Sequence, residues 1–328
     1  ILKSGIDRFG DDHWRPFFCV GLAYFVIAVM VPVTMLKTYG ENGKWTSSGV
    51  FWSLLAGAAG AFGALGVILA FGAKGKPVFV MPLIFGGAPV VNAFLTVYMS
   101  KAFKRINPIF LAGLVMVLLG AVSVLVFRPG PSGGSEGPTW GDWPWVLASV
   151  ALVIVCWGVY GPVLHKGQMK MSGSRLRPLI CVGLAYFVVA VIAPLIPLGW
   201  SGLITDVSWN GVWWSLGAGG AGAIGALGVI MAFNFGGKPV FVMPLIFGGA
   251  PVVNTFVTLF KSDQLEDPHP LFYAGLILTA AGAAIVLVFA PKGKAGQAPA
   301  MREPEQARQG PTASEDSTPA KSEAENSS

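Results

Sequence analysis

The sequence predicts an all-α polytopic membrane protein made of two inverted five-helix repeats, the first of which lacks its first helix. The membrane prediction follows from composition: 12% of the residues are charged and 54% are apolar, whereas soluble domains carry about 25% charged residues. The repeat prediction follows from an internal duplication. The segment GKPVFVMPLIFGGAPVVN at 75–92 recurs without a change at 237–254, and CVGLAYFV recurs at 19–26 and 181–188.

Long apolar runs predict the individual helices, because about 20 apolar residues cross the hydrocarbon core of a bilayer as one helix. In chain order these runs predict about nine transmembrane helices, at 16–36, 49–73, 77–99, 108–127, 144–164, 178–199, 211–235, 239–260 and 270–289. The helix 49–73 and its counterpart 211–235 are rich in Gly and Ala. Small residues let helix backbones approach closely in lipid, so we expect these two helices to pack tightly.

Aligning the two copies shows which helix the first copy lacks. Ile1 and Leu2 align with Val163 and Leu164, which end the predicted helix 144–164. The first repeat, 1–128, therefore has four predicted helices, and the second repeat, 144–290, has five. We expect a further helix upstream in the natural protein, which would make ten. A nine-helix protein is the alternative.

An odd number of helices per repeat places the two copies in opposite orientations across a membrane. Loop charges in the second copy support this, because Lys and Arg favour cytoplasmic loops. Only Lys261 lies on the outer side, whereas the inner side holds Lys166, Lys170, Arg175, Arg177, Lys238, Lys292 and Lys294. The first copy is less decisive. The second copy therefore predicts a cytoplasmic C-terminal tail and a multi-pass protein of the plasma membrane, here a bacterial inner membrane.

Two polar stretches complete the domain organisation. Residues 129–143 contain no Lys or Arg, which predicts an external linker between the halves. Residues 291–328 are rich in Ala, Pro, Glu and Ser and contain no aromatic residue, which predicts a disordered polar tail.

The sequence predicts no enzyme. No acidic residue lies deep in any predicted helix, which argues against a carboxylate-coupled proton carrier and against a metal-dependent prenyl transferase. There is no Gly-rich nucleotide loop, no paired-His zinc motif and no Ser-His-Asp set, and the three cysteines lack metal-ligand spacing. The basic residues lie mainly in loops and in the tail. We therefore expect no catalytic residue, cofactor, metal or nucleic-acid partner.

Candidates for a substrate site lie in the duplicated segment. Each copy has two prolines on one helix face, and proline leaves a backbone carbonyl without its usual donor. Helices broken at corresponding places in two halves are the sequence signature of a transporter's binding site. We therefore predict that Pro82, Pro244 and the nearby Asn92 and Asn254 contribute to substrate binding. The alternative is a close helix contact in which Asn forms a hydrogen bond to the neighbouring helix.

Aromatic residues within the apolar runs are the other candidates for substrate binding. Tyr24 and Tyr186 are equivalent in the two copies and lie in the middle of their helices, and Trp157 and Tyr160 lie in the helix whose counterpart is missing. For the tyrosines, lining a cavity and forming a hydrogen bond between helices are equally compatible with the sequence.

The segments 65–82 and 112–126, with their counterparts 227–244 and 274–288, resemble the ten-helix permeases of the drug/metabolite transporter superfamily, of the EamA type. The likeness extends over essentially all of 15–290. It implies cytoplasmic termini and movement of small metabolites through a central cavity, lined mainly by the first, third, fourth, sixth, eighth and ninth helices. One departure is that many relatives carry Glu near the start of the last helix of each half. Here the first half has none, and Glu266 lies in a loop.

These features are compatible with three functional hypotheses of different classes. The leading hypothesis is a permease that moves a small polar solute by alternating access, with the solute and membrane lipid as partners. The second is a non-transporting membrane scaffold or sensor in which the duplicated core serves packing alone. A membrane-embedded transferase has the least support. Whether the protein is a monomer or a homodimer stays open.

Overall fold

The computed structural model describes residues 2–6, 8–9, 12–75, 77–101, 107–127, 138–204, 207–261 and 269–289. Every regular element in these ranges is a helix, and they contain no β-strand. The predicted tail, 291–328, and most of the predicted linker lie outside the described residues.

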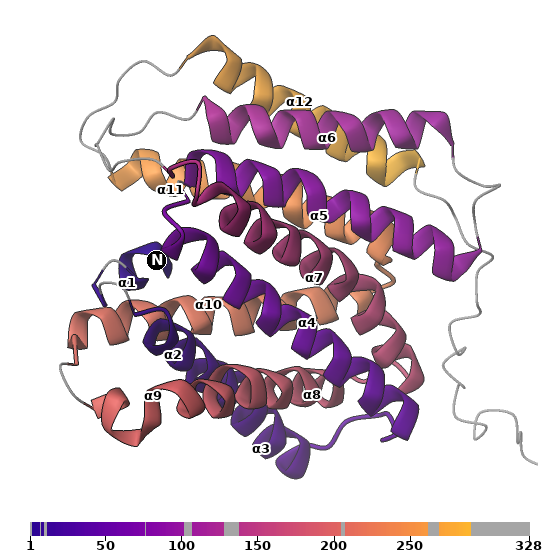
Figure 1. Ribbon diagram of the computed structural model, residues 1–328. Helices are drawn as coiled ribbons and strands as arrows, with labels where there is room; N and C mark the ends of the chain where they lie inside the picture. The colour runs from indigo at the N-terminus through magenta and orange to yellow at the C-terminus, as the bar shows by residue number, and fades with distance from the viewer. Residues whose placement is uncertain are drawn as a thin grey trace, which may run out of the picture. The chain divides into compact units, whose positions relative to one another are not determined.

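Apart from α1 (Leu2–Ile6), which lies before the first predicted run, the helices follow the predicted apolar runs. In chain order they are α1 (Leu2–Ile6), α2 (Trp14–Phe25), η1 (Val26–Met30), α3 (Val31–Thr38), α4 (Ser47–Gly72), α5 (Pro77–Ser100), α6 (Pro108–Val126), α7 (Trp143–Lys170), α8 (Leu176–Phe187), η3 (Val188–Ile192), α9 (Ala193–Ile204), α10 (Trp209–Asn234), α11 (Pro239–Lys261) and α12 (Pro270–Phe289), as Figure 1 shows. Within the described residues, five helical runs are long and apolar enough to cross a membrane: Trp14–Thr38, Ser47–Gly72, Trp143–Lys170, Leu176–Pro197 and Trp209–Asn234. The helices α5, α6, α11 and α12 contain shorter apolar stretches.

The end of α7 differs most from its predicted position. The prediction ended this helix at 164, where polar residues begin, but α7 continues to Lys170. The physical reason is that the polar last turns are packed against the protein. Gln168 is only 1% exposed, and its Nε2 donates a hydrogen bond to the carbonyl of Ile230 in α10 at 3.1 Å.

Two π-helical segments occupy equivalent places in the copies. The segment η1 joins α2 to α3, and η3 joins α8 to α9, so each set of three is one continuous run. Pro32 and Pro194 lie shortly after these segments. Because proline has no amide hydrogen, it cannot complete the usual bond to the carbonyl four residues earlier, and a wider turn accommodates that gap. The second run is also kinked at Gly199, whose φ of 62° favours glycine.

Packing between the copies is reciprocal. Gly21 of α2 lies against Ala190 and Val191, while its equivalent Gly183 lies against Ala28 and Val29, which are the equivalents of those two residues. The pairs Gly57–Val182 and Gly219–Val20, Gly5–Ser215 and Gly167–Ser53, and Gly120–Thr279 and Gly282–Val117 repeat this exchange. Such reciprocity is the contact pattern of a pseudo-two-fold axis between the parts of the two copies that meet.

Equivalent helices that meet at this axis run antiparallel. From Gly21 to Ala28 along the first copy, the contacts in the second copy descend from Ala190 to Gly183. The helices α6 and α12, which lie side by side in Figure 1, pair in the same way, because Gly113 meets Ile285 and Gly120 meets Thr279. A residue that touches its own equivalent must lie at the axis.

Candidate binding cavity

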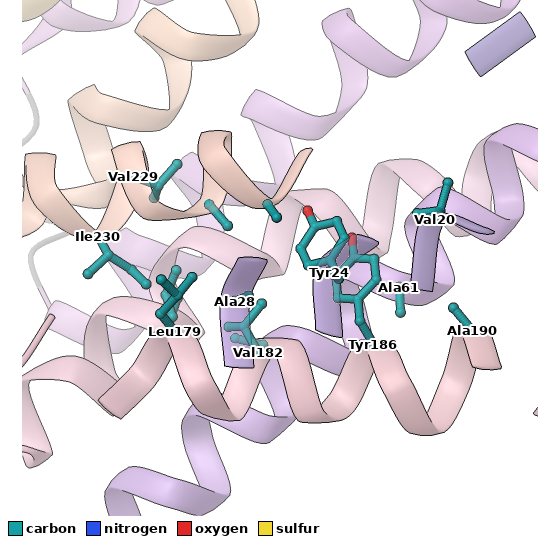
Figure 2. Close-up of a cluster of buried hydrophobic side chains, with 14 of the residues drawn as sticks. Val20, Tyr24, Ala28, Ala61, Leu179, Val182, Tyr186, Ala190, Val229 and Ile230 are labelled. Carbon is teal, nitrogen blue, oxygen red and sulfur yellow. The ribbon is translucent and has the colours of Figure 1, made fainter. Parts of the chain in front are cut away.

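Two equivalent tyrosines meet at the pseudo-two-fold axis. The rings of Tyr24 in α2 and Tyr186 in α8 are stacked with centroids 3.6 Å apart and an interplanar angle of 1°. Both are buried, at 7% and 5% exposure. Figure 2 shows their hydroxyl oxygens at the same end of the stack. The pair therefore presents two hydrogen-bonding groups on one side of an otherwise apolar contact.

Glycines on the neighbouring helices make room for this pair. A Cβ atom on Gly60 of α4 would lie 3.1 Å from the hydroxyl of Tyr186, and one on the equivalent Gly222 of α10 would lie 3.0 Å from the hydroxyl of Tyr24. Such distances are tighter than ordinary van der Waals contact. The glycine-rich faces of α4 and α10 thus let the two hydroxyls sit directly against a helix backbone.

A cavity of about 630 Å³ lies beside the tyrosine pair. Its volume is in the range of small-molecule pockets. Most of its wall comes from α10 and α11, through glycines such as Gly222 and Gly225 and the segment that includes Met243 and Phe247. The remaining wall comes from four aromatic side chains and Gly60. Side chains from both copies therefore border one space.

The structure brings together four of the eight predicted site residues. Tyr24, Trp157, Tyr160 and Tyr186 all line the cavity. Pro244 is buried in α11 between two lining residues and does not itself line the space. The side chains of Pro82 and Asn254 lie outside the described part of the chain.

The polar groups of the cavity wall are few. The indole nitrogen of Trp157 donates to the carbonyl of Gly60 at 3.4 Å, a long hydrogen bond. The three tyrosine hydroxyls supply the other side-chain polar atoms among the lining residues, none of which is ionisable as an acid or base at neutral pH. This wall suits a neutral solute with an apolar or aromatic body.

Asn92 forms a hydrogen bond between helices, which was the alternative to a role in substrate binding. It is fully buried in α5, and its Nδ2 donates to the carbonyl of Pro239, the first residue of α11, at 2.9 Å. Its Oδ1 has no hydrogen-bond partner among the described residues. Asn92 therefore joins the copies and keeps one unused acceptor.

The two copies differ on the open side of the cavity. In the first copy α7 covers three glycines: Gly63 lies against Trp157, Gly66 against Val153, and Gly87 against Ile154. Their equivalents are Gly225, Gly228 and Gly249, and no described atom lies within 4 Å of a Cβ placed on any of them. Internal symmetry would place a counterpart of α7 on this face. The predicted upstream helix stays a prediction.

Sequence reasoning missed most of the wall. Met243 and Phe247 belong to the duplicated segment, from which the prediction selected only prolines and asparagines. Gly60 and Gly222 belong to helices that the sequence assigns to tight packing, and each also borders the cavity. A usable signal was present: Tyr24 and Tyr186 are equivalent, and so are Gly222 and Gly60, which lie against their hydroxyls.

One buried carboxylate holds two loops together at an end of the bundle. Glu41, between α3 and α4, accepts hydrogen bonds from the Ser174 hydroxyl and from the amides of Arg175 and Leu176 at the start of α8. Its side chain is 6% exposed, and Arg177 lies 3.5 Å away. Burial opposes ionisation of Glu41, but these hydrogen bonds outweigh it and lower its pKa.

Comparisons with known proteins support the fold and give no function. No protein-family model matches the sequence, and a search of curated proteins finds no match. One solved structure, described as "Crystal structure of protein", superposes with a TM-score of 0.61. The alignment covers 88% of this chain and 92% of that one, with 19% sequence identity. At that identity the likeness extends to the fold alone.

Proposed function

We propose that this protein is a membrane permease that moves a small neutral solute by alternating access between two inverted repeats. The observation that carries the proposal is the cavity of about 630 Å³ beside the pseudo-two-fold axis, lined by tyrosines of both copies. When two equivalent halves rock against each other, a site between them opens first to one membrane face and then to the other. Secondary transporters use this arrangement.

The antiparallel packing of equivalent helices supports the inverted arrangement. If the helices cross the bilayer, then equivalent helices such as α6 and α12 cross it in opposite directions. We therefore assign all nine predicted runs as spans, including the four with shorter apolar stretches. A helix with a short apolar stretch can be accommodated by tilting, by local thinning of the bilayer and by polar residues at its ends.

Loop contacts support the proposed topology. The amide of Lys44 donates to the carbonyl of Met171 at 3.4 Å, and Glu41 contacts Arg175, so the α3–α4 and α7–α8 loops lie at one end. Both loops carry basic residues that the charge count assigns to the cytoplasm. We propose that this end faces the cytoplasm, in a plasma membrane such as a bacterial inner membrane.

Transport by the cavity is tested with purified protein in detergent and in proteoliposomes. A panel of neutral metabolites is first screened for solutes that raise the melting temperature, because a ligand that binds the folded state stabilises it. Each solute that does so is then followed across proteoliposomes. We expect flux that requires the protein, and a solute-dependent rise in melting temperature without any flux would instead favour the sensor alternative.

Two tyrosine variants connect any flux to this cavity. Tyr160→Phe removes a hydroxyl from the cavity wall, and we expect roughly two- to tenfold weaker solute binding, the usual contribution of one hydrogen bond. The matched control is Tyr98→Phe in α5. Tyr98 is 64% exposed and does not line the cavity. Equal effects of the two variants would refute the assignment of the site.

A further inference from the structure

The orientation of the Asn92 amide is fixed by its hydrogen bond. A carbonyl oxygen accepts only from a donor, so the amide nitrogen must face the carbonyl of Pro239, 2.9 Å away. The Oδ1 atom then faces the opposite direction, toward α7. A Cβ atom on Gly161 of α7 would lie 3.2 Å from it. Glycine at 161 therefore leaves the space in front of this acceptor free of an α7 side chain.

Met243 lies beside that space. Its sulfur would lie 2.7 Å from the same Cβ position on Gly161, so the thioether and Asn92 Oδ1 both lie beside one point on α7. Met243 also lines the cavity and is 3% exposed. The thioether has no hydrogen to donate, and Asn92 Oδ1 has no hydrogen-bond partner among the described residues. Met243 is therefore a close neighbour of this space and offers Asn92 Oδ1 no hydrogen.

A buried acceptor without a donor is unfavourable, and a flexible side chain is the part of its surroundings that can move most easily. Methionine has an unbranched side chain with three rotatable bonds and adapts its shape within a core. Rotation of Met243 toward another rotamer would connect Asn92 Oδ1 to the cavity.

We propose that Asn92 Oδ1 binds a hydrogen-bond donor of the transported solute, and that Met243 is a movable cover that separates this acceptor from the cavity. The inference rests on the proposed function, because it needs a solute in the cavity. It identifies the substrate class as neutral molecules that combine an apolar or aromatic body with an N–H or O–H group. The tyrosines contact the body, and Asn92 selects for the donor.

A matched pair of probes tests this selection. Phenol and anisole share a small aromatic ring, but only phenol carries an O–H donor. Their dissociation constants are measured on the full chain in detergent by calorimetric titration. We expect the wild type to prefer phenol by roughly three- to tenfold, the range of one neutral hydrogen bond. Asn92→Leu keeps the side-chain size, and we expect it to bind anisole as the wild type does and to lose the preference.

Gln168→Leu provides the control for the loss of a buried amide. Gln168 is 1% exposed and also donates to a carbonyl of a neighbouring helix, but it does not line the cavity. Its replacement should leave the phenol preference unchanged. Met243→Ala keeps Asn92 and removes the cover, so we expect it to increase the phenol preference. This second variant tests the inference even if Asn92→Leu does not fold.

The outcomes separate this inference from the function on which it rests. A wild type that binds both probes with a preference that Asn92→Leu retains would overturn the role of Asn92 and leave the cavity as a binding site. A preference unchanged in Met243→Ala would overturn the cover. If the wild type binds neither probe, the cavity does not accept small aromatic solutes, and the inference fails together with the proposed solute class.

Discussion

Two equivalent glycines that lie in unequal surroundings give the sharpest test of the fold. Gly63 of α4 and Gly225 of α10 are related by the duplication, but Gly63 lies against the indole of Trp157, whereas a Cβ on Gly225 would have no described atom within 4 Å. The perturbation is the same methyl group at each position, Gly63→Ala and Gly225→Ala. Because both positions are helical, the intrinsic gain from replacing Gly, about 0.5–1 kcal/mol, is the same and cancels between the variants.

The remaining difference is the cost of overpacking. At Gly63 the added methyl would overlap Cδ1 and Nε1 of Trp157 and would lie 3.1 Å from its Cε2. A rigid indole cannot move aside as a flexible chain end can, so we expect about 1–3 kcal/mol of destabilisation relative to the Gly225 variant. At about 2–4 °C per kcal/mol, the value for domains of about 150–250 residues, the two melting temperatures should differ by roughly 2–12 °C.

The assay is thermal unfolding of both variants and the wild type in one detergent, monitored by the recovery of monodisperse protein. Gly225→Ala should melt at or slightly above the wild-type temperature, and Gly63→Ala below it. Equal shifts of the two variants would refute the reasoning, because they would mean that the α10 face is covered as closely as the α4 face.

Two further predictions concern the contacts between the copies. Glu41→Gln should lower the melting temperature at neutral pH. Because folding lowers the pKa of Glu41, this loss should be constant above its usual pKa of 4.5 and should disappear as the pH falls through the lower folded-state value; a gap that persists at acidic pH would contradict the role of the carboxylate. Gly21→Val and Gly183→Val should each destabilise by about 1–3 kcal/mol and to a similar extent, because each adds bulk against an equivalent alanine and valine. Markedly unequal losses in chemical unfolding would contradict the pseudo-two-fold packing.

The helices could be predicted because their signal is local. An apolar run of sufficient length has to bond its own backbone groups in lipid, so length and composition alone locate the helices. The π-helical segments η1 and η3 are less visible, since a proline predicts a missing bond but not the wider turn that absorbs it. The extension of α7 to Lys170 could not be predicted, because it depends on a distant contact. Gln168 donates a hydrogen bond to the carbonyl of Ile230 in α10, which is 62 positions away.

Symmetry made the tyrosine pair of the candidate site predictable. Tyr24 and Tyr186 occupy equivalent positions in mid-helix, and equivalent residues meet if they lie at the axis. The role of Met243 depends instead on the register between α7 and α11, which no periodicity in a single helix specifies. Asn92 shows the same limit: its sequence position indicates a polar group in the membrane, but only the structure shows that one of its two polar atoms is used.

The duplicated segment shows why sequence identity between the copies does not give them the same role. Residues 75–92 and 237–254 are identical, yet Gly87 lies against Ile154 of α7, while a Cβ on its equivalent Gly249 would meet no described atom within 4 Å. The difference comes from α7, which covers the first copy of the segment and leaves the second open to the cavity. Met243 therefore lines the cavity because of its neighbours rather than its own identity. Two halves related by a two-fold axis can in this way form one asymmetric site. On the proposed function, a substitution in one copy should therefore change solute binding, whereas the equivalent substitution in the other copy should not.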